Sequence, residues 1–492
     1  MPFASGAVAV SARVLRLGEH AVRHAVGSTF FASSLARVGV QLMAVGTVIA
    51  VARYLDLQQF GAFALVSAVT VILTSLLYTG IYEFILRTGD LDADRDTAFW
   101  LLAGMGAFGA AAMAVTAFAF AGSAFAPLLI WLSLVPLLAG PTAWSEALLV
   151  RSGRIRLVAF TTLAVEMVGF CVLLVTLQAG EGVMALVWSR LTATIGGFAT
   201  KLALARTLPA LRAASLSGRR AMAAAAPLYL SASANLFANY GVDLLLGVFL
   251  SPAAVGAYRA GSRAASTGND LILRPMHAIT WSAFSRLERE NDTVGMREAW
   301  LAQTRFIIAV AWPAMAVLAL ASEPLVTLVL SKSWSAAAPI VTILAVSHAV
   351  GAAKALAAPV FVCRGRADIL VKLDIASALL LMLSLLAVVH LGPQWAAGAQ
   401  LAVKAAVVPM ALYSLAKLLD VGWRDLASAV MPGLALAVVC IVAMLGFDGI
   451  VSTSAASSDW SELRTVLVAA ILTWGVGFSG LLAVQVLHFP EP

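Results

Sequence analysis

Residues 60–84 read FGAFALVSAVTVILTSLLYTGIYEF, and the only charged side chain in this stretch is Glu83, near its end. A helix needs about 20 apolar residues to cross the hydrocarbon core of a bilayer, so the stretch is long enough to span a membrane. A transmembrane barrel would need strands of about ten residues with alternating polarity, whereas this stretch is uniformly apolar. Because lipid cannot satisfy a bare backbone, we predict a transmembrane helix.

Runs of the same kind recur along the whole chain of 492 residues, of which 61% are hydrophobic and only 12% are charged. A soluble domain is nearer a quarter charged, so lipid is the natural solvent for this chain. The pattern predicts an all-α polytopic membrane protein of about 14 transmembrane helices. The predicted spans are 29–52, 60–84, 97–121, 124–149, 157–178, 182–205, 222–250, 258–283, 302–322, 335–362, 369–391, 394–416, 427–446 and 465–488.

The breaks between these runs differ in charge. Even-numbered breaks hold clusters such as Arg151, Arg154 and Arg156, whereas odd-numbered breaks hold at most one cation, such as Lys332. Cytoplasmic loops carry an excess of Lys and Arg, so both termini are predicted to be cytoplasmic. The net charge of +7 is scattered over short loops without aromatic residues between the cations. We therefore expect no nucleic-acid partner.

The sequence offers little for enzyme chemistry. The breaks are too short for a separate soluble catalytic domain, and no phosphate-binding GxxxxGK[ST] loop is present. No Ser/His/Asp or paired-carboxylate arrangement stands out, so no catalytic residue is assigned. The three cysteines lie far apart, and no histidines and carboxylates share metal-ligand spacing. We therefore expect neither an enzyme nor a metal or other cofactor.

An internal repeat divides the chain. Residues 55–63, LDLQQFGAF, align with residues 250–258, LSPAAVGAY, at an offset of 195 residues. An even number of predicted helices separates the two segments, so the halves have parallel topology. The predicted organisation is a cytoplasmic N-terminal tail (1–28), a first six-helix bundle (29–206), a cytoplasmic linker (207–221), a second six-helix bundle (222–416) and two C-terminal transmembrane helices (427–488).

Five short motifs in order resemble those of polysaccharide-export flippases of the Wzx type. They are ARYL through FGAF at 52–63, VGAY at 255–258, FSRL at 284–287, Trp334 with Ala338-Pro339, and CRGR at 363–366. The sequence departs from the family pattern at Ser282, where proline is common, and at Ser331, where glycine is common. The resemblance places the chain in the polysaccharide transporter branch of the multidrug/oligosaccharidyl-lipid/polysaccharide exporter superfamily.

This resemblance implies a function. Such proteins flip an undecaprenyl-diphosphate-linked oligosaccharide repeat unit from the cytoplasmic to the outer leaflet of the bacterial inner membrane. The product serves exopolysaccharide, capsule or O-antigen (lipopolysaccharide) biosynthesis. The implied partners are the lipid-linked oligosaccharide, membrane lipids, and polysaccharide polymerase and export proteins.

Charged side chains inside the predicted spans form a pattern. Arg259, Arg263, Asp270, Arg274 and His277 recur at intervals of 4, 7, 4 and 3 residues, on one face of the eighth predicted helix. Charges in mid-bilayer usually face a cavity or a partner, and Arg suits phosphate. The substrate-binding candidates in such a cavity are Arg37, Gln41, Asn235, Asn239, Arg263, Arg274, Lys354 and Lys404.

Acidic residues in the spans have two interpretations. Asp243, Asp270 and Glu146 are candidates for coupling transport to an ion. Alternatively, they hold helices together by pairing internally, Asp270 with Arg274 on one helix and Asp243 with Arg263 across two helices. The sequence leaves both interpretations open.

Three other functions compete with the first. A peptidoglycan-precursor (lipid II) flippase would face the same physical problem of moving a lipid-linked polar head group across the bilayer, and it would have a similar cationic cavity. A multidrug/cation antiporter of the same superfamily would need membrane carboxylates. Asp243 is in keeping with it, but the excess of Arg and Lys argues against it. A membrane-embedded glycan-assembling enzyme is disfavoured by the short loops.

Overall fold

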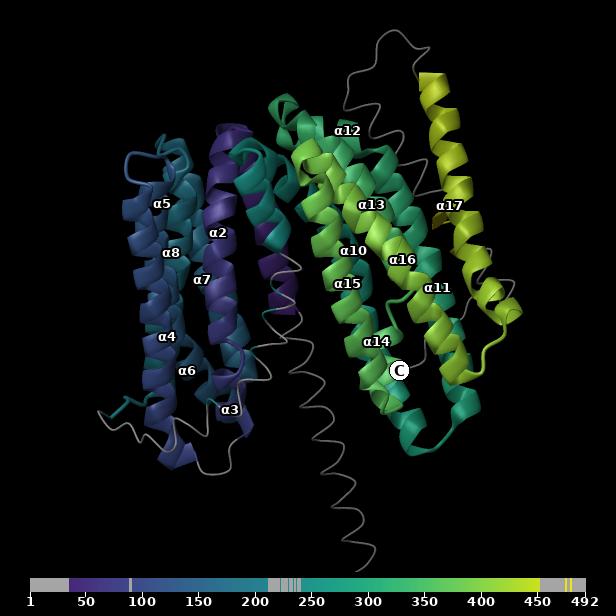
Figure 1. Cartoon of the computed structure of the whole chain (residues 1–492), viewed down its shortest axis with the longest axis horizontal. Helices are drawn as coiled ribbons and strands as arrows, with labels where there is room; N and C mark the ends of the chain where they lie inside the picture. The colour runs from purple at the N-terminus through teal and green to yellow at the C-terminus, as the bar shows by residue number, and fades with distance from the viewer. Residues whose placement is uncertain are drawn as a thin grey trace, which may run out of the picture. The chain divides into compact units, whose positions relative to one another are not determined.

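The structure is a computed structural model that describes residues 35–87, 91–210 and 240–451, together with residues 222, 229, 233, 236, 474, 475, 478 and 479. Every regular element in these residues is a helix (Figure 1). The predicted all-α fold is therefore confirmed. The predicted tail (1–28) and nearly all of the segments 211–239 and 452–492 lie outside the described residues.

The helices follow one another with short connections. The first is Leu35–Tyr54, and the others up to residue 210 are α2 (Leu57–Leu77), α3 (Ile81–Arg87), α4 (Leu91–Ala119), α5 (Phe125–Leu132), α6 (Leu134–Arg151), α7 (Ile155–Gln178) and α8 (Met184–Ala205). After residue 239 come Tyr240–Phe249, α10 (Pro252–Arg289), α11 (Thr293–Leu320), α12 (Ser322–Leu325), η1 (Val326–Leu330), η2 (Lys332–Ala337), α13 (Ala338–Ala352), α14 (Ala357–Cys363), α15 (Ala367–Val388), η3 (Val389–Leu391), α16 (Pro393–Leu419) and α17 (Trp423–Val451).

Among the described residues, ten helical segments are long and apolar enough to cross a membrane. Helices α8 and α10 are also long, but they carry more polar side chains. Two of the predicted spans, 222–250 and 465–488, are described only in part. The chain is thus a multi-pass membrane protein, as the hydropathy pattern predicts.

Three predicted continuous spans are broken. Pro136 and Pro359 explain two of the breaks, because proline has no N–H and its ring clashes with the carbonyl four residues earlier. Helix α5 accordingly ends four residues before Pro136, and residues 353–356 leave the helix just before α14, which contains Pro359. The third break, between α2 and α3, contains Gly80 at φ +64°, a conformation that glycine adopts at no steric cost.

The chain packs as two compact units, each described here by itself. Unit 1 is formed by Met1–Thr47 and Val69–Ser233. In it, α6 packs against α3, α4 and α8, and α7 packs along α8. A buried cluster around Trp144, Leu102 and Ile81 fills the interface of α3, α4 and α6. The fully buried Trp144 also donates from Nε1 to the carbonyl of Arg95, at 2.9 Å.

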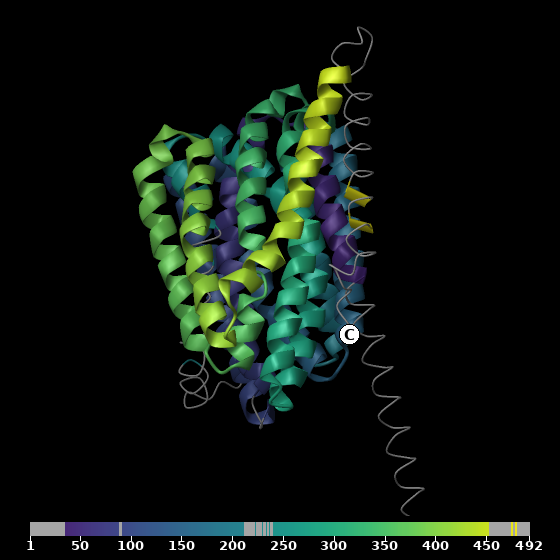
Figure 2. The same ribbon diagram turned by 90° about the vertical axis from the view of Figure 1, so that its right-hand side faces the viewer.

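Unit 2 is formed by Val48–Ala68 and Ala234–Pro492. Helix α13 is central in it and packs against α10, α11 and α16. Helix α17, drawn in yellow, lies along α11 in both views (Figures 1 and 2). Because residues of α2 belong to both units, this division does not test the predicted bundle boundaries, which stay predictions.

Candidate functional site

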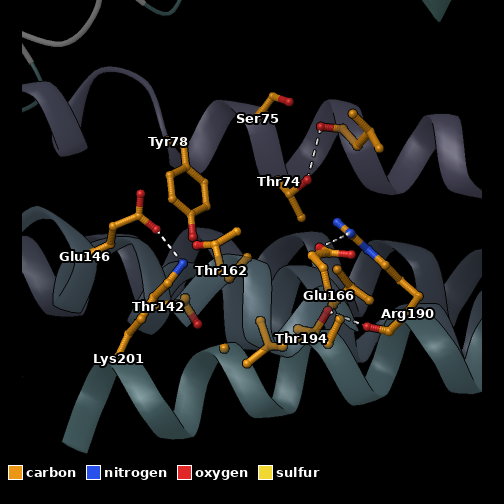
Figure 3. A pocket seen from close by; sticks show the side chains of 16 residues that line it. Thr74, Ser75, Tyr78, Thr142, Glu146, Thr162, Glu166, Arg190, Thr194 and Lys201 are labelled. Atoms are coloured by element: carbon orange, nitrogen blue, oxygen red, sulfur yellow. Dashed lines mark hydrogen bonds and ion pairs between the residues drawn. The ribbon is translucent and has the colours of Figure 1, made fainter. Parts of the chain in front are cut away.

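A cavity of about 470 Å³ lies inside unit 1. Helices α2, α6, α7 and α8 supply its sixteen lining residues, of which the ten labelled in Figure 3 are polar and the other six are apolar or glycine. The polar residues are Thr74, Ser75, Tyr78, Thr142, Glu146, Thr162, Glu166, Arg190, Thr194 and Lys201. A polar cavity among membrane-spanning helices is costly in apolar surroundings, so it marks a candidate functional site.

Helical spacing places these side chains on inward faces. Along α8, the lining residues Arg190, Thr194, Gly197 and Lys201 follow at intervals of 4, 3 and 4 residues. Such intervals bring side chains to one face of a helix. On α6 and α7 the same rule applies to pairs four residues apart, Thr142 with Glu146 and Thr162 with Glu166, so each helix turns polar side chains toward the cavity.

At one end of the cavity, Lys201 and Glu146 form a close ion pair. The distance from Lys201 Nζ to Glu146 Oε2 is 2.7 Å, and the two side chains are 8% and 18% exposed. The hydroxyls of Tyr78 and Tyr82 lie near the same carboxylate. Removing one partner of a buried ion pair leaves the other charge unpaired at a high cost in free energy. We therefore expect Lys201 and Glu146 to stay paired at this end of the cavity.

At the other end, Arg190 and Glu166 form a looser pair (Figure 3). Their closest nitrogen and oxygen atoms are 3.8 Å apart, and the side chains are 42% and 36% exposed. Exposed pairs of this kind contribute about 0–1 kcal/mol. Arg190 and Glu166 can therefore each leave this ion pair and bind another polar group at a small cost in free energy.

Threonine hydroxyls also line the cavity. Those of Thr74, Thr142 and Thr194 donate to main-chain carbonyls of their own helices, at 2.6 to 3.2 Å. Since a hydroxyl has one proton, the oxygens of these three residues are left to accept hydrogen bonds in the cavity.

Of the predicted site residues in unit 1, only Glu146 lines this cavity. Arg37 is exposed on the first helix, and Gln41 is half-buried and has an interaction partner. Tyr78, Arg190 and Lys201 also line the cavity and were not predicted from the sequence. The signal for the last two was available, because both cations fall within one predicted span at the helical spacing given above.

In unit 2, Asp243 is fully buried and pairs with Arg259 at 2.9 Å. The Arg259 guanidinium also lies over the Tyr240 ring, 4.8 Å from its centroid. The sequence-based pairing of Asp243 with Arg263 is therefore corrected. Asp243 and Arg259 stand eight residues either side of the turn at Ser251 and so lie at one level of the hairpin. Arg263 is about 6 Å further along the helix.

Helix α10 carries two further predicted residues, Arg263 and Asp270. Both are half-buried, and both have interaction partners. Three predictions lie outside what the structure describes. They are Asn235, Asn239 and the side chain of Arg274.

Lys354 and Lys404 both lie in unit 2. Lys354 lies at the break between α13 and α14, and Lys404 lies on α16. The Lys404 side chain crosses Gly351, where an added Cβ would be 3.6 Å from Lys404 Cδ. Gly351 precedes Lys354 by three residues, so the Lys404 side chain packs next to the turn that carries Lys354. Both residues were predicted from the sequence, but nothing in the sequence indicates that Lys404 packs against Gly351.

The described residues contain no group of three or more His, Cys, Asp or Glu side chains that could hold a metal ion. Two ion pairs and several hydroxyls line the cavity of unit 1. These groups can bind a polar ligand through hydrogen bonds and charge.

Solved structures similar to this chain are membrane transporters. A lipid II flippase in an inward closed conformation superposes with a TM-score of 0.72 at 11% identity, over 92% of this chain and 99% of that one. An inward-facing multidrug resistance transporter of the MATE family in the MOP superfamily has a TM-score of 0.59 at 14% identity, over 77% of this chain and 94% of that one. At these identities the likeness shows a shared fold.

Sequence comparison gives the family. The teichuronic acid biosynthesis protein TuaB of Bacillus subtilis (strain 168) is 30% identical over 152 residues, which is 30% of this chain and 30% of that protein's length. The model of the family described as "Polysaccharide biosynthesis protein" matches residues 50–339, more than half of the chain. The chain belongs to this family of polysaccharide biosynthesis proteins.

Proposed function

We propose that the chain flips an undecaprenyl-diphosphate-linked oligosaccharide repeat unit across a bacterial inner membrane, from the cytoplasmic to the outer leaflet. The observation that carries the proposal is a cavity with ten polar lining side chains between helices of a multi-pass membrane protein, in a member of a polysaccharide biosynthesis family. A saccharide cannot cross lipid without such a path, because each unpaired polar group costs several kcal/mol there. The fold is also one that a lipid flippase uses.

In this proposal, both termini face the cytoplasm and the chain acts without catalysing a covalent change. The lipid tail stays in the bilayer while the protein carries the head group. The product then serves exopolysaccharide, capsule or O-antigen synthesis, with polymerase and export proteins as downstream partners.

The structure offers less support for a multidrug/cation antiporter. Such a protein needs a lumen that attracts cations. In the cavity of unit 1, each of the two carboxylates, Glu146 and Glu166, already faces a cation at 2.7 and 3.8 Å. In unit 2, the buried Asp243 is likewise paired with Arg259. These carboxylates have no surplus negative charge for a cationic drug.

The proposal is tested by deleting the gene in its source strain. We expect lipid-linked saccharide to accumulate in the cytoplasmic leaflet and surface polysaccharide to fall, with both restored by the wild-type gene. If both pools stay unchanged, the assignment is wrong. Accumulation of lipid II instead of another lipid-linked saccharide would identify the chain as a peptidoglycan-precursor flippase.

A further inference from the structure

The size of the unit 1 cavity excludes some ligands. Its volume of about 470 Å³ falls within the range of about 300–1,000 Å³ in which small organic molecules bind. A bare cation would leave most of this space unfilled. The described residues also lack the cluster of three or more acidic, histidine or cysteine side chains that a metal ion needs.

The charge of the cavity disfavours ligands that carry a net charge. Glu146 and Lys201 balance each other, as do Glu166 and Arg190. A diphosphate would have to approach both carboxylates, and like charges a few ångströms apart repel strongly away from bulk water. A cation would face the same difficulty with Arg190 and Lys201. The balanced wall favours a ligand without net charge.

The hydrogen-bonding groups favour a ligand rich in hydroxyls. The oxygens of Thr74, Thr142 and Thr194 only accept, because their protons bind their own helices. The carboxylates also accept, whereas the Arg190 guanidinium donates. A sugar hydroxyl donates one hydrogen bond and accepts others, so a sugar ring can satisfy both kinds of group at once.

The two ion pairs of the cavity differ in how tightly they are held. The Lys201–Glu146 pair is short and buried, and it fixes one end of the cavity. The Arg190–Glu166 pair is long and partly exposed. A carboxylate and a guanidinium that are only loosely paired can turn to a ligand hydroxyl, with charge-assisted hydrogen bonds as the gain.

We propose that the unit 1 cavity is the saccharide subsite of this protein, in which Glu166 and Arg190 bind hydroxyls of one uncharged sugar ring of the cargo. The inference rests on the proposed function and deepens it. It also separates the two parts of the head group, since the diphosphate has no place in this cavity.

The test compares lipids that differ only in the sugar. Binding to the purified full-length protein in nanodiscs is measured for undecaprenyl diphosphate and for undecaprenyl diphosphate carrying glucose, galactose or N-acetylglucosamine. We expect at least one sugar-bearing lipid to bind about tenfold more tightly than the bare carrier, which corresponds to about 1.4 kcal/mol.

Two variants assign this difference to the cavity. At Gly197 an added Cβ meets no atom closer than 4.0 Å, so Gly197→Leu places its side chain in the cavity. The control is Gly104→Leu, at an exposed glycine with nothing within 4 Å. Thr162→Val removes a lining hydroxyl. Its control is Thr161→Val on the same helix, whose hydroxyl bonds to the main chain at 2.7 and 3.0 Å.

The expected result is that Gly197→Leu and Thr162→Val reduce the preference for the sugar-bearing lipid and leave binding of bare undecaprenyl diphosphate unchanged. Both controls should keep the preference. If the two cavity variants keep it as well, the saccharide subsite lies elsewhere and the inference is overturned, although the proposed function stands. If the wild-type protein binds none of these lipids, the proposed function fails together with the inference.

Discussion

The backbones of Gly61 and Gly256 pack directly against each other within unit 2, in a reciprocal contact. A Cβ added to Gly61 would lie 1.6 Å from the carbonyl oxygen of Pro252, and one added to Gly256 would lie 2.2 Å from that of Leu57. Leu57 and Pro252 are themselves 195 residues apart, as are the two glycines. The first turns of α2 and α10 therefore meet about a local twofold axis, like the self-complementary contact of a symmetric dimer.

This contact predicts that Gly61→Ala destabilises the protein, although alanine favours helices. Two backbones would have to separate, and overpacking of this kind costs about 1–3 kcal/mol or more. Thermal unfolding in detergent measures the effect, with Gly104→Ala as the control because nothing lies within 4 Å of its added Cβ. Equal melting temperatures for the two variants would contradict the close contact.

Gly61 and Gly256 also show which parts of the fold can be predicted from the sequence. The repeat at 55–63 and 250–258 is visible in the sequence, and its two copies are in contact in the structure. Long apolar runs likewise predict the spans, because lipid leaves the backbone few alternatives. A repeat alone does not say that its copies touch. That information lies in the close approach that only glycine permits.

The candidate site was less predictable, because pairing across helices depends on rotation and depth. Glu146 and Lys201 are 55 residues apart, and nothing in their local sequence relates them. Asp243 pairs with Arg259 and not with Arg263 because Arg263 lies about one helical turn further along α10. The spacing of Lys201 to Arg190 on α8 is visible in the sequence and Glu146 was predicted as a candidate, but the pairing of Lys201 with Glu146 could not be predicted.

The buried Lys201–Glu146 pair gives a second prediction. Lys201→Met leaves the Glu146 carboxylate without its cation, and loss of one partner of a buried pair costs about 3–5 kcal/mol. The double variant Lys201→Met/Glu146→Gln should recover most of the lost thermal stability. Arg190→Met, which breaks the looser pair, should cost under about 1 kcal/mol. A double variant as unstable as the single one would show that packing, not charge, dominates at Lys201.

A third prediction concerns Asp243. Because Arg259 pairs with it inside unit 2, we expect Arg259→Met to lower the melting temperature and Arg259→Met/Asp243→Asn to restore it. If the Asp243–Arg259 pair has a structural role, the double variant should recover transport together with its melting temperature. If the double variant folds like the wild type but no longer transports, Asp243 acts in ion coupling, as its position in the sequence also allows.

The two lysines of unit 2 lead to a fourth prediction. If the diphosphate lies outside the unit 1 cavity, as we propose, cations elsewhere must bind it, and Lys354 and Lys404 are two of the predicted candidates in unit 2. Lys354→Met/Lys404→Met should weaken binding of bare undecaprenyl diphosphate at least about tenfold, because hydrogen bonds to charged groups contribute about 1.5–3 kcal/mol each. Lys417→Met, at an exposed lysine of the same helix α16, is the control and should change little. Equal binding by both variants would exclude the lysines from the diphosphate site.

The central claim is that this chain alone moves a saccharide-bearing lipid between leaflets. The direct test is reconstitution of the purified protein in liposomes with a fluorescent undecaprenyl-diphosphate-linked sugar, whose outer-leaflet fraction is read by a membrane-impermeant quencher. We expect transfer by the wild-type protein to be well above that in protein-free vesicles, and to be slowed by Gly197→Leu but not by Gly104→Leu. Transfer no faster than in protein-free vesicles, with and without Na⁺ or proton gradients, would contradict it.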